Sequence, residues 1–280
     1  MMNDAQPLGK QEVQLLLEKY SGNLLFKRVL QESSAQDISQ TVAKYVCFNR
    51  LFGASVASLA SRLAQNTNLF LDNKETSDLW NDRSMEVASS IFAAAIDEFG
   101  DRGFSSNPTH RMLAQATVKG LDSYSRLRID DINKDSEHIR TTFDPQVCNG
   151  YGVNARLDEH LLFKSVGFHI GSELLADGEF RILDSTLREK YPKLVRYLEN
   201  TTITISGNSV PAYRWIGIHT TVEIDHFDHA LHAANISLQY YGGSQQKSEV
   251  RKQIFEGVEE FAIFQEGFMK YLSERKRKPT

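Results

Sequence analysis

Three residues in the segment 214–235 have the types and the spacing of ligands in a metal centre. His219, Glu223 and His226 are four and three residues apart. This places their side chains on one face of an α-helix, over two turns and about 10 Å of its axis. Neutral imidazoles and a carboxylate are donors for non-haem iron, manganese or zinc, and the trio contains no thiolate. The spacing therefore predicts a helix that supplies part of a metal site.

The same segment allows a second interpretation. It also carries His229 and His232, and a helix rich in histidine is often an exposed polar helix. Apolar residues beside the trio favour burial instead, and a buried ionisable cluster requires partners such as a metal. These neighbours are Trp215, Ile216, Ile218 and Val222. We expect Asp225, Asp228 and His229 to be solvated or to lie just outside the metal ligands.

A second group of candidate ligands stands where one predicted helix ends and the next begins. Asp97 and Glu98 precede Gly100, and His110 opens the following helical pattern. A short polar turn between the two helices lets a carboxylate and an imidazole face the same space. Acidic residues at the C-terminus of a helix oppose its dipole, so their presence calls for another reason. An ordinary helix end is the alternative for this group.

The third group lies in the segment 157–177, which contains Glu159, His160, His169 and Glu173. His169 and Glu173 are four residues apart and share a helix face. Glu159 and Glu173 are separated by about 21 Å along one helix, so they cannot serve one cluster. Glu173 lies in the apolar run GFHIGSELL, where an unpaired carboxylate is costly. It is the predicted ligand, with Glu159 as the alternative and His169 as a residue beside the ligands or in the cavity.

Two glycines in the same apolar run need an explanation. Gly167 and Gly171 are poor helix formers, each costing up to about 1 kcal/mol relative to alanine. Either a ligand or another helix approaches the backbone closely at these positions. The sequence leaves both alternatives open.

The hydrophobic pattern of the chain is helical almost throughout. We expect an all-α protein with one bundle of seven or eight helices. The expected helices cover residues 10–20, 37–65, 75–99, 110–120, 157–177, 180–198, 214–235 and 250–275. Residues 130–154 are rich in Asp, Asn, Thr and Gly, which predicts a loop with at most one short helix. The run TTITISGNSVP predicts a short hairpin or an extended segment.

Composition excludes several classes of function. The 280-residue chain has 41% hydrophobic and 24% charged residues, as is ordinary for a soluble globular protein. Its net charge of −4 offers no surface for nucleic acid. Two distant cysteines outside any CxxC pattern fit a reducing compartment. No apolar run is long enough to span a membrane, the first residues do not resemble a signal peptide, and no nucleotide-binding glycine motif is present. We expect a cytoplasmic protein that binds neither membrane nor nucleic acid.

These candidate ligands resemble the pattern of the haem-oxygenase-like di-iron oxidases and oxygenases, the iron-containing redox enzymes related to the chlamydial death-domain-associating protein. That pattern is a Glu, a nearby His, a mid-chain Glu and then His-x3-Asp-x2-His. The matching residues here are Glu98, His110, Glu173, His219, Glu223 and His226. The chain departs from the pattern at Glu223, where the family more often has Asp, and in a longer loop after Glu98. A ferritin-like bundle fits less well, because it needs two Glu-x-x-His pairs and the chain supplies one.

The resemblance covers about residues 35–270 and implies a fold, a cofactor and a reaction class. The implied fold is one haem-oxygenase-like (TenA-like) helical domain over residues 35–280, after a helical extension over residues 1–34. The implied cofactor is two irons per chain, or manganese, held by three histidines and three carboxylates. Reduced iron would activate dioxygen to oxidise a small amino-acid, amine or fatty-acid substrate. A homodimer is compatible with this assignment. Cavity or core residues would include Phe48, Phe52, Phe92 and Phe168.

Two rival functions share this fold. A metal-free thiaminase-like hydrolase needs a cysteine nucleophile and a carboxylate, but neither Cys47 nor Cys148 stands in a setting that activates a thiol. A non-catalytic binding protein needs no metal at all. Iron content separates both rivals from a di-iron oxidase.

Overall fold

The computed structural model describes residues 6–77, 80–101, 103, 106–153 and 158–275. These residues are mostly helical, which confirms the predicted all-α class, but they form twelve α-helices where seven or eight were expected. The helices are α1 (Lys10–Leu17), α2 (Gly22–Gln31), α3 (Ala35–Phe48), the 3-10 turn η1 (Asn49–Leu51), α4 (Phe52–Gln65), α5 (Ser84–Glu98), α6 (His110–Ser125), α7 (Ile129–Thr142), α8 (Asp144–Gly150), α9 (Glu159–Lys190), α10 (Pro192–Asn200), α11 (Arg214–Tyr240) and α12 (Lys247–Arg275). Within these residues, no helix combines the length and apolar character needed to cross a bilayer.

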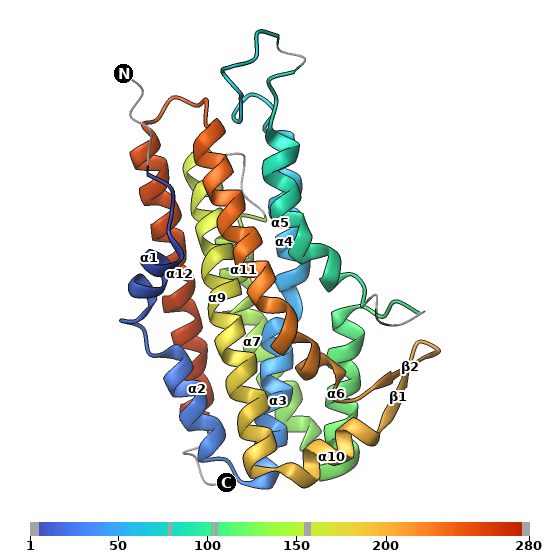
Figure 1. Ribbon diagram of the computed structural model, residues 1–280. Helices are drawn as coiled ribbons and strands as arrows, with labels where there is room; N and C mark the ends of the chain where they lie inside the picture. The colour runs from blue at the N-terminus through green and yellow to red at the C-terminus, as the bar shows by residue number, and fades with distance from the viewer. Residues whose placement is uncertain (1–5, 78–79, 102, 104–105, 154–157, 276–280) are drawn as a thin grey trace.

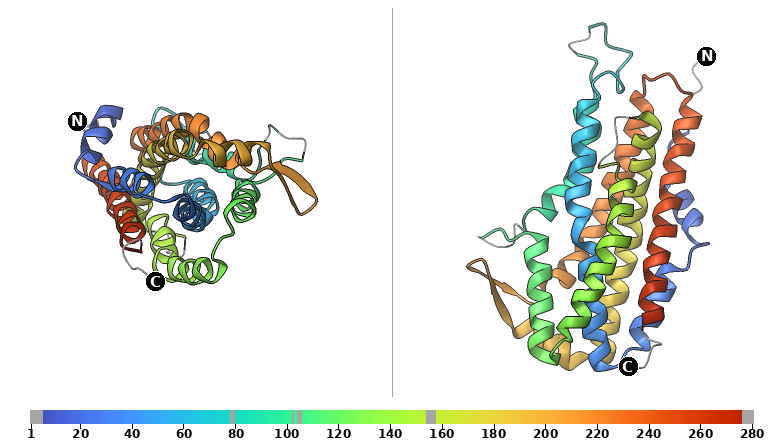
Figure 2. Two further views of the ribbon diagram at one scale, coloured as in Figure 1. Left: turned by 90° about the horizontal axis from the view of Figure 1, so that it is seen from below. Right: turned by 180° about the vertical axis from the view of Figure 1, so that it is seen from behind.

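Three long helices, α9, α11 and α12, run side by side along the molecule (Figure 1), and α9 packs against both of the others. Seen along the bundle, α3 and α4 lie inside a ring formed by other helices (Figure 2, left). α4 packs closely on α5, and α11 contacts α5, α6 and α9. α1 and α2 pack on α12; the division of the chain at residue 35 stays a prediction. This arrangement brings α5, α6, α9 and α11 into contact around the predicted ligands.

The helix expected over residues 37–65 is interrupted. α3 ends at Phe48, η1 follows, and α4 begins at Phe52. The side-chain amide of Asn49 donates a hydrogen bond of 2.9 Å to the carbonyl oxygen of Tyr45, one turn earlier. A 3-10 turn tightens the backbone without breaking the hydrophobic pattern, so the pattern did not reveal it. The interruption matters because Phe48 and Phe52, on either side of it, both face the cavity described below.

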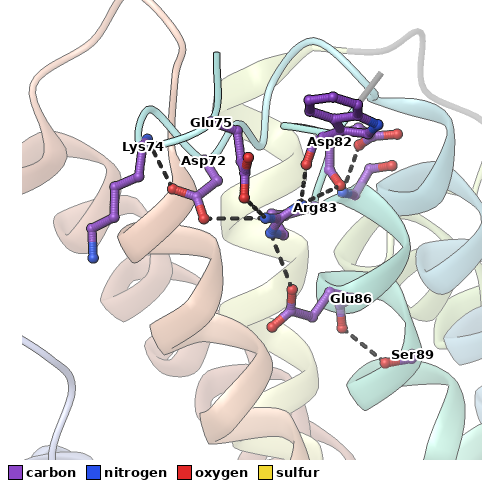
Figure 3. Close-up of polar contacts among 9 residues, drawn as sticks. Asp72, Lys74, Glu75, Asp82, Arg83, Glu86 and Ser89 are labelled. Atoms are coloured by element: carbon purple, nitrogen blue, oxygen red, sulfur yellow. Dashed lines mark hydrogen bonds and ion pairs between the residues drawn. The ribbon is translucent and has the colours of Figure 1, made fainter. Parts of the chain in front are cut away.

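The helix expected from residue 75 begins only at Ser84. The carboxylate of Asp82 accepts a 2.8 Å hydrogen bond from the backbone N–H of Ser84 and so caps the first turn. The guanidinium of Arg83 pairs with Asp72 at 3.1 Å and Glu86 at 3.6 Å (Figure 3). These contacts hold the preceding segment as a loop against the helix start, which helical propensity alone does not show.

The prediction of a loop over residues 130–154 was wrong. Most of this segment forms α7 and α8. α7 is a mostly exposed helix that buries few residues, among them Asp135 and Ile139. The carboxylate of Asp135 pairs with Lys44 at 2.9 Å and accepts a 2.7 Å hydrogen bond from Tyr271. Because tertiary polar contacts hold this helix, its polar composition mimicked that of a loop.

The prediction of two separate helices over residues 157–177 and 180–198 was also wrong. A single 32-residue helix, α9, runs through Gly178 to Lys190, and α10 begins at Pro192, a favoured first helical residue. A Cβ atom at Gly178 would lie 2.3 Å from the side-chain nitrogen of Asn23. Gly178 therefore admits α2 to the surface of α9 and does not end the helix.

Close helix packing explains the glycines at 167 and 171. A Cβ atom at Gly167 would lie 1.8 Å from the carbonyl oxygen of Ile254, and one at Gly171 would lie 3.1 Å from that of Val258. Both contacts are with α12. Of the two alternatives, the approach of another helix is confirmed.

A short hairpin connects α10 to α11. β1 (Thr202–Ile205) pairs antiparallel with β2 (Asn208–Pro211). Ser206 and Gly207 occupy the turn with φ angles of 49° and 82°, as a two-residue hairpin loop of the primed type requires. The predicted hairpin is confirmed, and the alternative of an extended segment is excluded.

Candidate metal centre

Glu98, His110 and His219 form a compact group with the donors of a metal site. One ligand atom from each lies within 4.8 Å of the others. His110 Nδ1 is 3.0 Å from Glu98 Oε1, and His219 Nε2 is 3.9 Å from the same oxygen. The two histidines are buried and the glutamate is half-buried. The helix end at α5, the first residue of α6 and the middle of α11 thus meet as the sequence predicted.

Local structure orients both histidines of this group. His219 Nδ1 donates a 2.6 Å hydrogen bond to the carbonyl oxygen of Trp215, which leaves Nε2 as the nitrogen directed toward Glu98. This is the usual support for a metal-binding imidazole. Thr109 caps α6 by accepting a 3.2 Å hydrogen bond from Met112, which fixes His110 at the first helical position. His110 Nε2 is buried and has no hydrogen-bond partner among the described residues.

A second group of donors stands beside the first. Glu173 Oε1 is 3.2 Å from His169 Nδ1, and Glu173 Oε2 is 3.6 Å from His226 Nδ1. All three residues are buried. Tyr151 lies 3.4 Å from His169 Nδ1 and hydrogen-bonds with Ser172 at 2.8 Å. The structure therefore brings the predicted mid-chain carboxylate to the last histidine of the trio.

One cavity of about 50 Å³ joins the two groups. Because one water needs roughly 10–15 Å³ of such space, the cavity has room for about three to five water molecules. It is lined by Phe48, Asn49, Phe52, Gly53, Val56, Ala94, Glu98, Ser172, Glu173, Ala176, Glu179, Phe180, His219, His226 and Phe261. A second space of about 50 Å³ beside it is lined by both histidines of the first group. Four of the predicted ligands line the main cavity.

The electrostatics suit cation binding. Burial alone would raise the pKa of Glu98, but its interactions with His110 and His219 outweigh burial and hold that pKa well below its usual range. Burial lowers the pKa of His219 and of His169 below the ordinary histidine value, although a neighbouring glutamate opposes it in each case. A carboxylate and neutral imidazoles are the protonation states that metals bind.

Some predicted site residues lie elsewhere. Glu223 is on α11 between the two histidines of the trio, but its side chain, like that of Asp97, lies outside the described residues; its ligand role stays a prediction. Asp225 and His229 are exposed. Of the two expectations for them, solvated groups or residues just outside the ligands, their exposure supports the first, because the helical turn directs them to the solvent side of α11.

The other candidates divide between surface and core. Glu159 accepts a hydrogen bond from Tyr241 and does not line the cavity. Phe92 is 46% exposed. Phe168 is buried against the rings of Tyr151 and Phe261. Of the four phenylalanines proposed for the cavity, only Phe48 and Phe52 line it.

Sequence reasoning missed one acidic residue of the cavity, Glu179. It is 3% exposed and follows Glu173 on the same helix. Glu179 was missed because a helix break was expected around residues 178–179, so it was not placed on the same helix as Glu173. A continuous helical pattern of Glu173, Ala176 and Phe180, all of which line the cavity, was the signal that could have found it.

Gly53 gives the first test of this geometry. A Cβ atom there would lie 2.8 Å from Glu98 Cβ and 2.9 Å from Glu98 Oε2. We expect Gly53→Ala to displace Glu98 and weaken metal binding about 10–100-fold, as loss of a supporting contact does. Gly267→Ala, where a Cβ atom meets nothing within 4 Å, is the control. Calorimetric titration with ferrous iron measures both, and equal affinities would show that Gly53 does not position Glu98.

The comparisons with known proteins add no family to this geometry. No protein-family model matches the chain. No curated protein matches its sequence. The functional assignment therefore depends on the residues of the site.

Proposed function

We propose that this chain is a non-haem di-iron oxidase or oxygenase of the haem-oxygenase-like fold, acting with dioxygen on a small organic substrate. The observation that supports the proposal is the meeting of two donor groups at one cavity. Glu98, His110 and His219 form the first, and Glu173 with His226 forms the second. Glu223 would lie between them on α11 and complete a set of three histidines and three carboxylates.

The donors present fit iron, with manganese as the alternative. They are imidazole nitrogens and carboxylate oxygens, the ligands of non-haem iron sites. The unpartnered His110 Nε2 is a buried polar atom that needs a partner. Neither cysteine lines the cavity, and burial raises the pKa of the Cys148 thiol, the opposite of what a cysteine nucleophile needs. The thiaminase-like alternative therefore has little support.

The chain's own residues have three roles in this proposal. The carbonyl oxygen of Trp215 holds the imidazole of His219 in the tautomer that presents Nε2 to the metal. Phe48, Phe52, Phe180 and Phe261 line the cavity and exclude water. Bound ferrous iron would supply electrons and open coordination positions for dioxygen. The protein fixes the ligands and keeps a shaped, mostly dry space next to them.

Iron loading tests the proposal. The purified chain, loaded anaerobically with ferrous iron, is expected to bind close to two irons and then to consume dioxygen. His219→Ala and His226→Ala should each lose at least one iron per chain. His232→Ala, on an exposed residue of the same helix, is the matched control and should keep both. Full iron content in both site variants, measured by atomic emission, would exclude the assignment.

A further pair of variants tests the mid-chain ligand. Glu173→Ala is expected to remove one iron, because Glu173 contacts His226 in the cavity. Glu159→Ala is expected to keep both irons, because Glu159 bonds with Tyr241 outside the cavity. Iron content and dioxygen uptake of the two variants decide the point. The reverse result would move the ligand to Glu159.

A further inference from the structure

Glu179 is a third cavity carboxylate, and the proposed iron site does not use it. Its side chain is buried. The hydroxyl of Tyr45 donates to one carboxyl oxygen, and the amide of Gln265 donates to the other at 2.6 Å. Both donors are neutral. Among the described residues, no lysine, arginine or histidine pairs with this carboxyl. A buried carboxylate without a countercharge is costly, so Glu179 needs a proton or a cation.

Aromatic rings surround Tyr45, whose hydroxyl donates to this carboxyl. The ring centroid of Tyr45 is 5.6 Å from that of Phe180, 5.9 Å from that of Trp215 and 6.4 Å from that of Phe48. Phe48 and Phe180 also line the cavity. The faces of aromatic rings attract cations, and ammonium groups are commonly bound between such rings and a carboxylate. The surroundings of Glu179 therefore favour a cationic ligand group.

The charge of the cavity lining points the same way. It contains the carboxylates Glu98, Glu173 and Glu179, and no lysine or arginine among its described lining residues. At the Glu179 end of the cavity, which the proposed iron site does not use, an anionic head group would meet a like charge in a medium of low dielectric constant. A fatty acid or the carboxylate of an amino acid is therefore disfavoured, and a simple amine is favoured.

The position of Glu179 suits a substrate anchor. It follows Glu173 by six residues on the unbroken α9, which separates the two by about 9 Å along the helix axis. The ring of Phe180, the next residue, stacks on His219 with centroids 4.0 Å apart and planes 14° apart. An amino group held at Glu179 thus leaves the rest of a small molecule to extend towards the iron ligands.

We propose that Glu179 anchors the protonated amino group of the substrate, which is a small primary amine. This inference rests on the proposed function and names its substrate class. When the ammonium group enters, the carboxyl releases its proton to solvent and its oxygens accept N–H hydrogen bonds. Burial raises the pKa of Glu179 to about 7, so the exchange of proton for cation takes place near neutral pH.

Ethylamine is a suitable probe, because a cavity of about 50 Å³ holds only a compact molecule. Its binding is measured by calorimetry at pH 8 on the full chain, before and after loading with ferrous iron. Glu179→Gln should weaken binding at least about tenfold. Glu189→Gln, an exposed position on the same helix, should leave it unchanged. In the iron-free chain, ethanol and acetate should bind more weakly than ethylamine.

Several results would overturn this inference. They are equal ethylamine affinity in wild type and Glu179→Gln, no ethylamine binding by wild type, or tighter binding of acetate than of ethylamine. If Glu179→Gln does not fold, Glu179→Asp is used instead. Its side chain is shorter by one methylene, so the carboxylate lies farther from the amine and ethylamine binding should also weaken. Unchanged binding would again contradict the proposal. If the chain binds iron but no amine, the amine inference is wrong and the di-iron function stands. If the chain binds amine through Glu179 but takes up no iron, the di-iron function is wrong and the amine site stands.

Discussion

Gly167→Ala is expected to lower the free energy of unfolding by about 3 kcal/mol or more. The added methyl would lie 1.8 Å from the carbonyl oxygen of Ile254, which is backbone and cannot rotate away. The backbone of α9 approaches α12 just as closely, since a Cβ atom at Gly257 on α12 would lie 1.9 Å from the carbonyl oxygen of Lys164 on α9. Overpacking costs about 1–3 kcal/mol and more where the backbone must move. The gain of up to about 1 kcal/mol from replacing a helical glycine does not offset it.

Urea denaturation of the iron-free chain measures this effect. Gly267→Ala is the control on α12, because a Cβ atom there meets nothing within 4 Å. It should leave stability unchanged or raise it by up to about 1 kcal/mol. A midpoint for Gly167→Ala equal to that of wild type would show that α9 and α12 separate easily at this crossing.

Glu179→Gln is expected to make the iron-free chain more stable than wild type at pH 8, by on the order of 3 kcal/mol. Burial raises the pKa of Glu179 from its ordinary value of 4.5 to about 7, although hydrogen bonds with Tyr45 and Gln265 oppose the shift. The folded chain therefore holds this proton more tightly than the unfolded chain. The stability it contributes is fully present below pH 4.5 and is lost as the pH rises to about 7.

The introduced amide keeps the neutral form at every pH. Its oxygen can accept from Gln265, and its nitrogen can donate to the hydroxyl of Tyr45. Wild type and Glu179→Gln should therefore have similar stability near pH 4.5 and diverge up to pH 7. Urea denaturation across this range measures the difference. Glu189→Gln is the control, and a constant difference at all pH values would show that Glu179 is not a buried acid.

The fold was predictable where hydrophobic periodicity is strong. The helices around His110, His219 and Phe268 follow it closely. Prediction failed where tertiary contacts decide the local structure. Gly178 has the appearance of a helix end until the side chain of Asn23 is seen to occupy the space of its missing Cβ atom. The polar helix α7 depends on contacts of Asp135 with α3 and α12, which no local pattern contains.

Part of the candidate site was predictable from residue types at fixed spacing. The i, i+4, i+7 pattern of α11 identified His219 and His226, and the helix boundary identified Glu98 and His110. Which acids face the cavity depends on the rotation of each helix in the bundle. Asp225 is therefore exposed on α11, whereas Glu179, which no motif marks, lines the cavity.

The unbroken course of α9 would let the protein discriminate among amines by the length of their carbon chain. Glu173 and Glu179 belong to one rigid helix that is held from both sides, by α12 at Gly167 and by α2 at Gly178. The distance between Glu173 and Glu179 along the helix axis is therefore fixed, whereas two residues on a loop could move relative to each other. Under the proposed function, a molecule held at Glu179 would reach the proposed iron ligands only if its chain had the matching number of bonds. Homologous amines should then differ in how well their oxidation is coupled to dioxygen uptake, more than in how tightly they bind.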